Sequence, residues 1–253
     1  MTTSTTTRTR NITAISGLLC AVVFIGGLFV TGLLIPSSAP ANLPRSDPAE
    51  IQQFFVEQGD LAQVQALIQT ASAALLLIFS GSLASLSRRS GKDTRGMADI
   101  ALAGGVLASV FLIISALIAA TLGVEQVNDS PAAVSLLRQL SFFVGGTGHT
   151  IGLGILVGAS SLAARGADLL PRWLTTAGMV SAVLSLLSVL SLILPPTAVF
   201  IPLGRFSALL VIAAASVLMV RGRTVTSKRS RAGISVLSGV GVVLLAVVVM
   251  VAV

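Results

Sequence analysis

The sequence predicts an all-α, polytopic transmembrane helix bundle, and three observations lead to that prediction. First, 54% of the 253 residues are hydrophobic and only 10% are charged, whereas a soluble domain carries about 25% charged residues. Second, the apolar residues gather in seven runs, each near the roughly 20 residues that cross a bilayer as a helix. Third, the basic residues fall in alternate loops, as membrane topology requires.

The seven expected spans lie at residues 12–35, 61–86, 100–122, 140–163, 173–194, 203–220 and 234–253. Helices are expected because backbone polar groups in lipid must be satisfied within the segment. Six spans remain if the first is cleaved as a signal peptide at Ala39-Pro40-Ala41, or if the last does not insert. The first run exceeds the usual 7–15 apolar residues of a signal peptide, which favours a retained anchor.

Basic residues indicate the orientation of the chain. Thirteen of the 16 Lys and Arg residues precede or follow the spans on the side of the N-terminus: Arg8, Arg10, Arg88, Arg89, Lys92, Arg95, Arg165, Arg172, Arg221, Arg223, Lys228, Arg229 and Arg231. Only Arg45, Arg138 and Arg205 fall on the opposite side. The positive-inside rule therefore predicts a cytoplasmic-membrane protein with its N-terminus in the cytoplasm and its C-terminus outside.

The same topology explains the net charge of +7 without a nucleic-acid partner. Basic loops on the cytoplasmic side are attracted to anionic inner-leaflet lipids by roughly 1 kcal/mol per residue. The most basic segment, residues 221–231, contains no aromatic residue that could stack on a base. We therefore expect the lipid bilayer as a partner, and no nucleic acid.

The polar ends of the spans have expected structures of their own. Residues 1–11 are polar and predict a disordered cytoplasmic N-terminus, and residues 12–253 predict a single transmembrane domain. Asp47 and Pro48 begin an outer interfacial helix over about residues 48–60, either separate or continuous with the second span and bent at Gly59. A second helix, starting at Asp129-Ser130-Pro131, is expected to run into the fourth span. The two projecting ends either pack together, with Arg138 near Glu57 or Asp60, or form separate solvated faces.

Residues 145–154 read GGTGHTIGLG and resemble the glycine-rich loop of short-chain dehydrogenases. That interpretation fails, because the stretch lies inside an apolar run and the chain contains no tyrosine for catalysis. A continuous helix is expected there, with small residues that let helices approach closely. The expected packing positions are Gly145, Gly148, Gly152, Gly154 and Gly158, serving contacts within the chain or, alternatively, homodimerisation.

His149 is the only histidine and lies within the fourth span. An ionisable group at that depth suggests a functional site, but the alternative is a neutral histidine with a structural hydrogen bond. Metal or haem binding would need further ligands, and neither a second histidine nor an acid lies within any span. No cofactor is therefore expected. Gln65 and Gln69 lie one turn apart in the second span, and together with His149 they define a candidate polar crevice.

The fifth span carries Ser181, Ser185, Ser188 and Ser191 on one helix face, which predicts close packing through shared hydrogen bonds. Arg205 begins the sixth span, and its long side chain is expected to reach back to the outer interface.

The stretch Leu170-Pro171-Arg172-Trp173-Leu174, followed by Gly178, resembles an element of uncharacterised multi-pass membrane proteins of bacteria, often actinobacteria. The resemblance implies a bundle of six or seven helices. It supplies no catalytic residues.

Taken together, these features favour a non-enzymatic membrane protein with an assembly, regulatory or structural role, with a homo-oligomer or another membrane protein as its partner. The alternative is a transporter or channel for a small molecule or ion, built around Gln65, Gln69 and His149. Transporters usually show repeats, broken helices or coupling carboxylates. The sequence shows no convincing repeat and no acidic residue within a span. An intramembrane enzyme is a third class, disfavoured because no acid, base or metal set accompanies His149.

Overall fold

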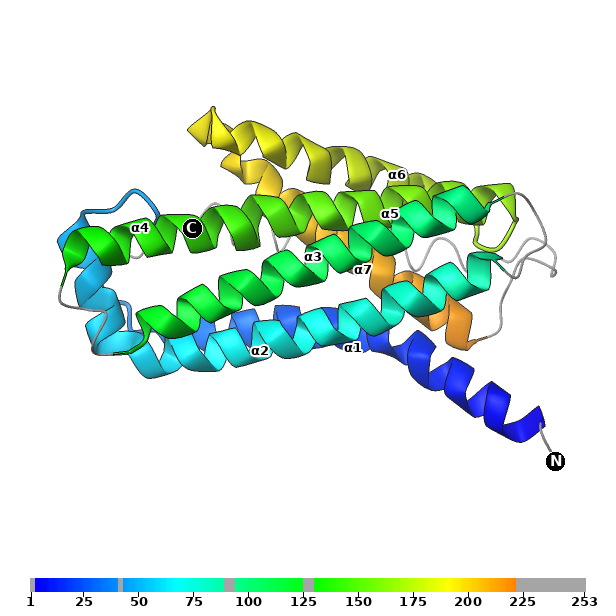
Figure 1. Cartoon of the computed structure of the whole chain (residues 1–253), viewed down its shortest axis with the longest axis horizontal. Coiled ribbons are helices and arrows are strands. Elements are labelled where there is room, and N and C mark those ends of the chain that lie inside the picture. The colour runs from blue at the N-terminus through cyan, green and yellow to red at the C-terminus, as the bar shows by residue number, and fades with distance from the viewer. Residues whose placement is uncertain (1–2, 41–42, 89–93, 125–129, 222–253) are drawn as a thin grey trace.

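The computed structural model describes residues 3–40, 43–88, 94–124 and 130–221. Within these ranges the secondary structure is helical and contains no strand. Six of the helical segments are long and apolar enough to cross a membrane, and they lie roughly side by side along the length of the molecule (Figure 1). The all-α class is thus confirmed. The expected seventh span, residues 234–253, and most of the basic segment before it lie outside the described residues.

The first helix, α1 (Thr3–Leu34), starts earlier than expected. Residues 3–11, for which the sequence predicts disorder, are helical in the structure. Once a helix is nucleated, each added residue gains one hydrogen bond, so a strong apolar helix can extend into a polar flank. The apolar part, Ile15–Leu34, has a mean hydropathy of 2.4 and includes most of the expected first span.

The expected interfacial helix and second span form one helix, α2 (Pro48–Arg88), with a kink between them. Asp47 caps its start, where Oδ1 accepts a hydrogen bond of 2.8 Å from the backbone N–H of Ala49. At Gln58 the backbone leaves the helical region, with φ −122° and ψ 24°. The next residue, Gly59, packs against Gly123. A Cβ atom added to Gly123 would lie only 2.6 Å from the carbonyl oxygen of Gly59. The kink therefore depends on close backbone contact with the end of the neighbouring helix.

That neighbour is α3 (Arg95–Leu122), which runs antiparallel to α2 (Figure 1). At the far end of the pair, Arg88 and Asp99 form an exposed ion pair. This end of the molecule also carries the connection between α5 and α6, residues 167–171, and we call it the loop end. The opposite end carries the kink of α2 and the start of α4, and we call it the cavity end.

The fourth span is interrupted by a π-helix. It comprises α4 (Pro131–Phe142), the π-helix η2 (Phe143–Gly148) and α5 (His149–Gly166), in one continuous helical segment. The expected early start is confirmed, with Ser130 as the N-cap. The continuous helix expected through residues 145–154 is confirmed, although residues 143–148 wind more widely than an α-helix. A π-turn loosens the regular hydrogen-bond ladder and occurs often at functional sites.

The remaining spans also contain irregular turns. α6 (Arg172–Leu187) ends in a 3₁₀ turn, η3 (Ser188–Leu192), and a second 3₁₀ turn, η4 (Pro195–Val199), leads into α7 (Phe200–Val220). α1 contacts α2 and α7, α3 lies between α2 and α5, and α6 contacts α5 and α7. The described helices thus enclose a common interior.

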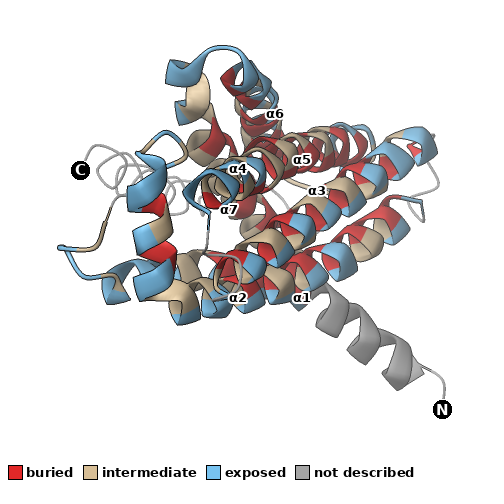
Figure 2. Ribbon diagram, turned by 60° about the vertical axis from the view of Figure 1, so that its left-hand side comes forward, coloured by how far each residue is buried: buried red, intermediate tan, exposed pale blue. Residues whose placement is uncertain are grey.

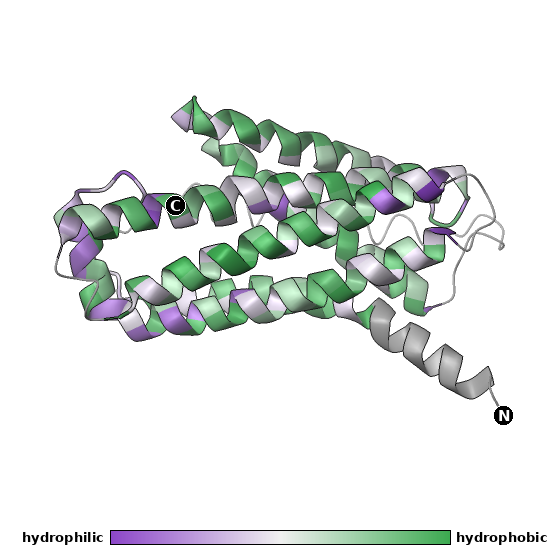
Figure 3. Ribbon diagram, viewed as in Figure 1, coloured by the Kyte–Doolittle hydropathy of each residue, from purple (hydrophilic) through white to green (hydrophobic). Residues whose placement is uncertain are grey.

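Large apolar side chains fill the interior of the bundle, and other large apolar side chains cover its outer surface. Buried residues occupy the inward faces of the helices (Figure 2). The main apolar cluster includes Leu76, Phe79, Leu112, Leu153, Leu156, Leu209 and Ile212. On the outside, Leu67, Leu117 and Val183 are more than half exposed. Hydrophilic residues gather towards both ends of the bundle (Figure 3). This distribution suits a bundle surrounded by lipid.

A smaller apolar cluster joins the two projecting helix ends at the cavity end. It consists of Ile51, Phe54 and Phe55 from the first part of α2, Leu122 from α3 and Val134 from α4. The expected packing of the two ends is therefore confirmed, and separate solvated faces are excluded. The cluster forms one wall of the cavity described next.

Candidate functional site

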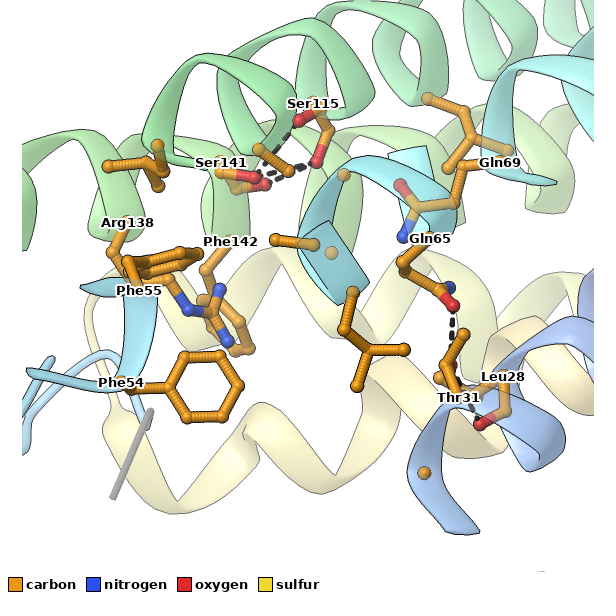
Figure 4. Close-up of a pocket in the computed structure, with 18 of the residues that line it drawn as sticks. Leu28, Thr31, Phe54, Phe55, Gln65, Gln69, Ser115, Arg138, Ser141 and Phe142 are labelled. Carbon is orange, nitrogen blue, oxygen red and sulfur yellow. Dashed lines mark hydrogen bonds between the residues drawn. The ribbon is translucent and has the colours of Figure 1, made fainter. Parts of the chain in front are cut away.

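A partly open cavity of about 330 Å³ lies among α1, α2, α3, α4, η2 and α7, at the cavity end of the bundle (Figure 4). Most of its wall is apolar and comes from Leu28, Ile35, Phe54, Phe55, Leu61, Leu112, Leu122, Phe142 and Ile201. The polar side chains are Thr31, Gln65, Gln69, Ser115, Ser141, Arg138 and Arg205. No acidic residue lines it among those described. The cavity wall is thus mainly apolar with a few polar side chains. Its two charged side chains, Arg138 and Arg205, are both positive.

Gln65 and Gln69, expected to form a polar crevice, both lie in this wall. The Oε1 atom of Gln65 accepts a hydrogen bond of 2.6 Å from the Thr31 hydroxyl, which ties α2 to α1 (Figure 4). On the opposite side, the Ser115 hydroxyl lies 2.9 Å from the Ser141 carbonyl and 3.0 Å from the Ser141 hydroxyl. Hydrogen bonds between helices therefore fix two sides of the cavity.

Arg138, at the end of the bundle where the two projecting helix ends meet, lines the cavity and lies beside the Phe54 and Phe55 rings (Figure 4). This cavity position was not predicted from the sequence, although the spacing contained a usable signal. Arg138, Ser141 and Gly145 follow at intervals of three and four residues, which places them on one face of a helix.

Arg205 also lies in the cavity wall, and the expectation that it reaches the outer interface is wrong. Its Nη2 atom donates to the carbonyl oxygens of Gly145 and Gly146, the latter at 3.3 Å. Its guanidinium lies over the Phe24 ring, 5.4 Å from the centroid. Since a π-turn loosens the helix's own hydrogen bonds, η2 can supply carbonyl acceptors that a regular helix would hold more tightly. Arg205 therefore remains inside the bundle because neutral dipoles and an aromatic face solvate it.

His149 lies next to this arrangement and is 1% exposed. Its Nδ1 atom lies 2.9 Å from the carbonyl oxygen of Ala108, and because a carbonyl only accepts, Nδ1 carries the hydrogen. Its ring stacks on Phe24, with centroids 6.1 Å apart and planes 21° apart. The Nε2 atom is buried and has no partner among the described residues. Phe24 thus contacts both His149 and Arg205.

The structure separates the three residues expected to share a crevice. Gln65 and Gln69 line the cavity, whereas His149 does not and reaches it only through Phe24 and Arg205. No group of three or more His, Cys, Asp or Glu side chains in the described segments could hold a metal ion. The charged groups of the candidate site are therefore arginines.

The glycines of residues 145–158 lie against two different helices. Gly145, Gly148 and Gly152 approach α3, and a Cβ atom on Gly152 would lie 2.5 Å from the backbone nitrogen of Ala108. Gly154 and Gly158 approach α6, where added Cβ atoms would lie 2.8 and 2.9 Å from side-chain atoms. These positions thus make helix contacts within the chain.

The serine face of α6 lies against α7 and η2. The Ser181 and Ser207 hydroxyls are 2.8 Å apart, and the Ser188 hydroxyl donates to the Ser185 carbonyl at 2.6 Å. Ser185 is fully buried, and its Cα atom would lie only 2.6 Å from a Cβ atom placed on Gly204. The Ser191 hydroxyl pairs with that of Thr147 in η2, at 2.9 Å. Small side chains therefore allow α6 to pack closely on its neighbours.

The loop at residues 170–174 begins α6 at the loop end of the molecule. Pro171 is the N-cap residue, Leu174 is buried, and Leu170 and Trp173 pack against the main apolar cluster.

No family model matches the sequence, and comparisons with curated proteins and with solved structures gave no match. The assignment of a function therefore rests on the cavity and its side chains.

Proposed function

We propose that this chain is a non-enzymatic, multi-pass protein of the cytoplasmic membrane that binds a small, mainly apolar molecule in the cavity. The observation that carries the proposal is the cavity itself, with its apolar wall and few polar side chains. Ligand sites in proteins are usually concave and apolar, with a small number of polar groups that orient the ligand. The distribution of basic residues supports a cytoplasmic N-terminus, so the cavity would lie in the outer half of the membrane.

The size of the cavity limits the ligand. Its volume of about 330 Å³ is near the lower end of the roughly 300–1,000 Å³ typical of ligand pockets. This volume suits a small molecule or one acyl chain better than a two-chain lipid. The partly open wall allows entry from the membrane or from the outer solution.

The rest of the interior favours binding over conduction. Below the cavity, Leu76, Phe79, Leu153 and Leu156 are fully buried and fill the space between the helices. A further cavity at this level measures only about 20 Å³, little more than the 10–15 Å³ that one water requires. Within the described segments, the cavity thus has no open continuation towards the loop end.

The proposal can be tested on the full chain purified into lipid nanodiscs. Native mass spectrometry should detect a small amphiphile that stays bound after delipidation, or that binds when palmitate or hexadecanol is added. Ala119→Phe should abolish this binding because residue 119 lines the cavity. Leu117→Phe is the matched control, since Leu117 lies on the same helix and is 60% exposed on the outer surface. Failure of the wild-type protein to bind any single-chain amphiphile would contradict the proposal.

A further inference from the structure

The described residues that line the cavity include positive side chains and no negative one. Two arginines line it, and none of the acidic residues among those described does. Acidic side chains occur nearby in sequence, in the first part of α2, but Glu57 is exposed and lies outside the cavity wall. An ionised side chain inside a membrane protein usually pairs with an opposite charge or marks a ligand pathway. The cavity therefore offers a positive environment to whatever binds there.

Arg205 has the clearest unmet requirement. All of its hydrogen bonds within the described structure are made by Nη2, to two neutral carbonyls, and its Nε atom is buried without a partner. The only other interaction is with the Phe24 ring. An arginine has five donors in a planar fork that suits carboxylate and phosphate oxygens. The Nη1 atom makes none of these hydrogen bonds and is not among the buried unpaired atoms, so its donors remain available at the cavity wall.

We infer that the ligand is a single-chain amphiphile with an anionic carboxylate or phosphate head, and that Arg205 is its counter-ion. This inference rests on the proposed function, because it names the chemical class that the cavity accepts. The head lies at Arg205, and the chain lies against the apolar wall formed by residues such as Leu28, Phe55 and Leu122. Arg138 adds a second positive charge to the same wall.

Binding of the anion compensates for the burial of Arg205. A hydrogen bond to a charged group contributes more than one between neutral groups, and a low-dielectric surrounding strengthens the attraction between opposite charges. An uncharged head of similar size would leave Arg205 without a counter-charge. The protein should therefore distinguish two ligands of equal chain length by the charge of the head alone.

The test compares palmitate, hexadecyl phosphate and hexadecanol on the full chain in nanodiscs of zwitterionic lipid, with acetate as a chain-free anion. We expect palmitate or hexadecyl phosphate to bind at least about tenfold more tightly than hexadecanol, since each 1.4 kcal/mol corresponds to a factor of ten. Acetate should not bind measurably. In Arg205→Gln the preference should fall below about threefold, whereas Arg205→Lys should retain most of it. Arg88→Gln removes the same charge at the loop end and should leave the preference unchanged.

Each result distinguishes the two proposals. Equal binding of palmitate and hexadecanol by the wild-type protein would overturn the anionic ligand while leaving the binding cavity intact. Absence of binding by all the amphiphiles would overturn the cavity as well. Acetate binding as tight as palmitate binding would overturn the single-chain requirement. If Arg205→Gln does not fold, Ile201→Glu offers a second variant. It places a carboxylate one turn from Arg205 in the cavity wall, and retention of the preference in that variant would contradict the role of Arg205.

Discussion

The two halves of the bundle solve the problem of burying helices in opposite ways. The interior of the packed half, towards the loop end, is closed by residues such as Phe79, Leu156 and Gly152, and the small cavity between Phe79 and Leu156 measures only about 20 Å³. The cavity half surrounds the cavity with irregular backbone, at Gln58 and in η2, and with charged side chains. Small residues thus allow the helices of the packed half to meet closely, while departures from regular helix accompany the cavity in the other half.

The largest change in stability should come from substituting His149, which lies between the two halves. His149→Ala removes a fully buried ring, its contact with Phe24 and its hydrogen bond to Ala108. We expect the free energy of unfolding to fall by about 3–5 kcal/mol, the range of changes from a buried aromatic ring to alanine. The measurement is thermal or denaturant unfolding in a fixed detergent. His149→Phe keeps a ring of similar shape and should cost about 1 kcal/mol, mainly for the lost hydrogen bond. Equal stability of His149→Ala and wild type would show that the ring is not packed as described.

The next effect concerns the closeness of the packed half. Gly152→Ala places a Cβ atom against the backbone of Ala108, which cannot move without shifting α3. We expect a loss of about 1–3 kcal/mol in unfolding free energy, as for other overpacked sites. Gly81→Ala is the matched control, because nothing lies within 4 Å of its added Cβ atom. That control should be neutral or stabilising, since alanine favours helix over glycine by up to about 1 kcal/mol. The same loss in both variants would mean that close approach is not the cause.

A smaller effect is expected from the serine pair that ties α3 to the end of α4. The Ser115 and Ser141 hydroxyls lie 3.0 Å apart and also bond each other's backbone. A double-mutant cycle with Ser115→Ala and Ser141→Ala should give a coupling energy of about 0.6 kcal/mol, typical of hydrogen bonds between membrane helices. Unfolding of the four proteins in one detergent measures it. Strict additivity of the two substitutions would show that the pair does not act as a unit.

The smallest stability change should come from filling the cavity. Ala119→Leu adds a side chain to the cavity wall, and we expect unfolding free energy to change by less than about 1 kcal/mol because space is present. Ala108→Leu, at a fully buried position in α3, should cost about 1–3 kcal/mol by overpacking. Thermal unfolding of both variants under one condition gives the difference. Similar losses would indicate that the two halves are equally packed, and the contrast between them would be wrong.

Much of the fold follows from the sequence, because apolar length determines where a helix can cross a membrane. The early start of the fourth span at Ser130 was legible from its capping residue and Pro131. Gln65 and Gln69 were found because polar side chains one turn apart stand out on an apolar helix. Local patterns therefore identified elements and some of the residues that line the cavity.

The position of Arg205 could not be found in the same way. A long cationic side chain near a helix end normally reaches the interface. Nothing in the sequence indicates that Arg205 instead donates hydrogen bonds to carbonyl oxygens of η2. Those carbonyls are available only because α7 and η2 meet in the folded bundle. The bend near Gly59 was expected from the glycine itself, but its contact with Gly123, which is distant in sequence, was not. Features made by contact between distant segments require the structure.

The π-helix has a consequence for the phase of the fourth span. Because a π-turn accommodates one more residue than an α-turn, η2 acts like a single inserted residue between α4 and α5. An α-helix advances about 100° per residue, so deleting one residue from 143–148 would rotate α4 by about that angle relative to α5. Arg138 would then turn away from the cavity while His149 kept its place. The one extra residue in the π-helix thus determines which side of α4 faces the cavity.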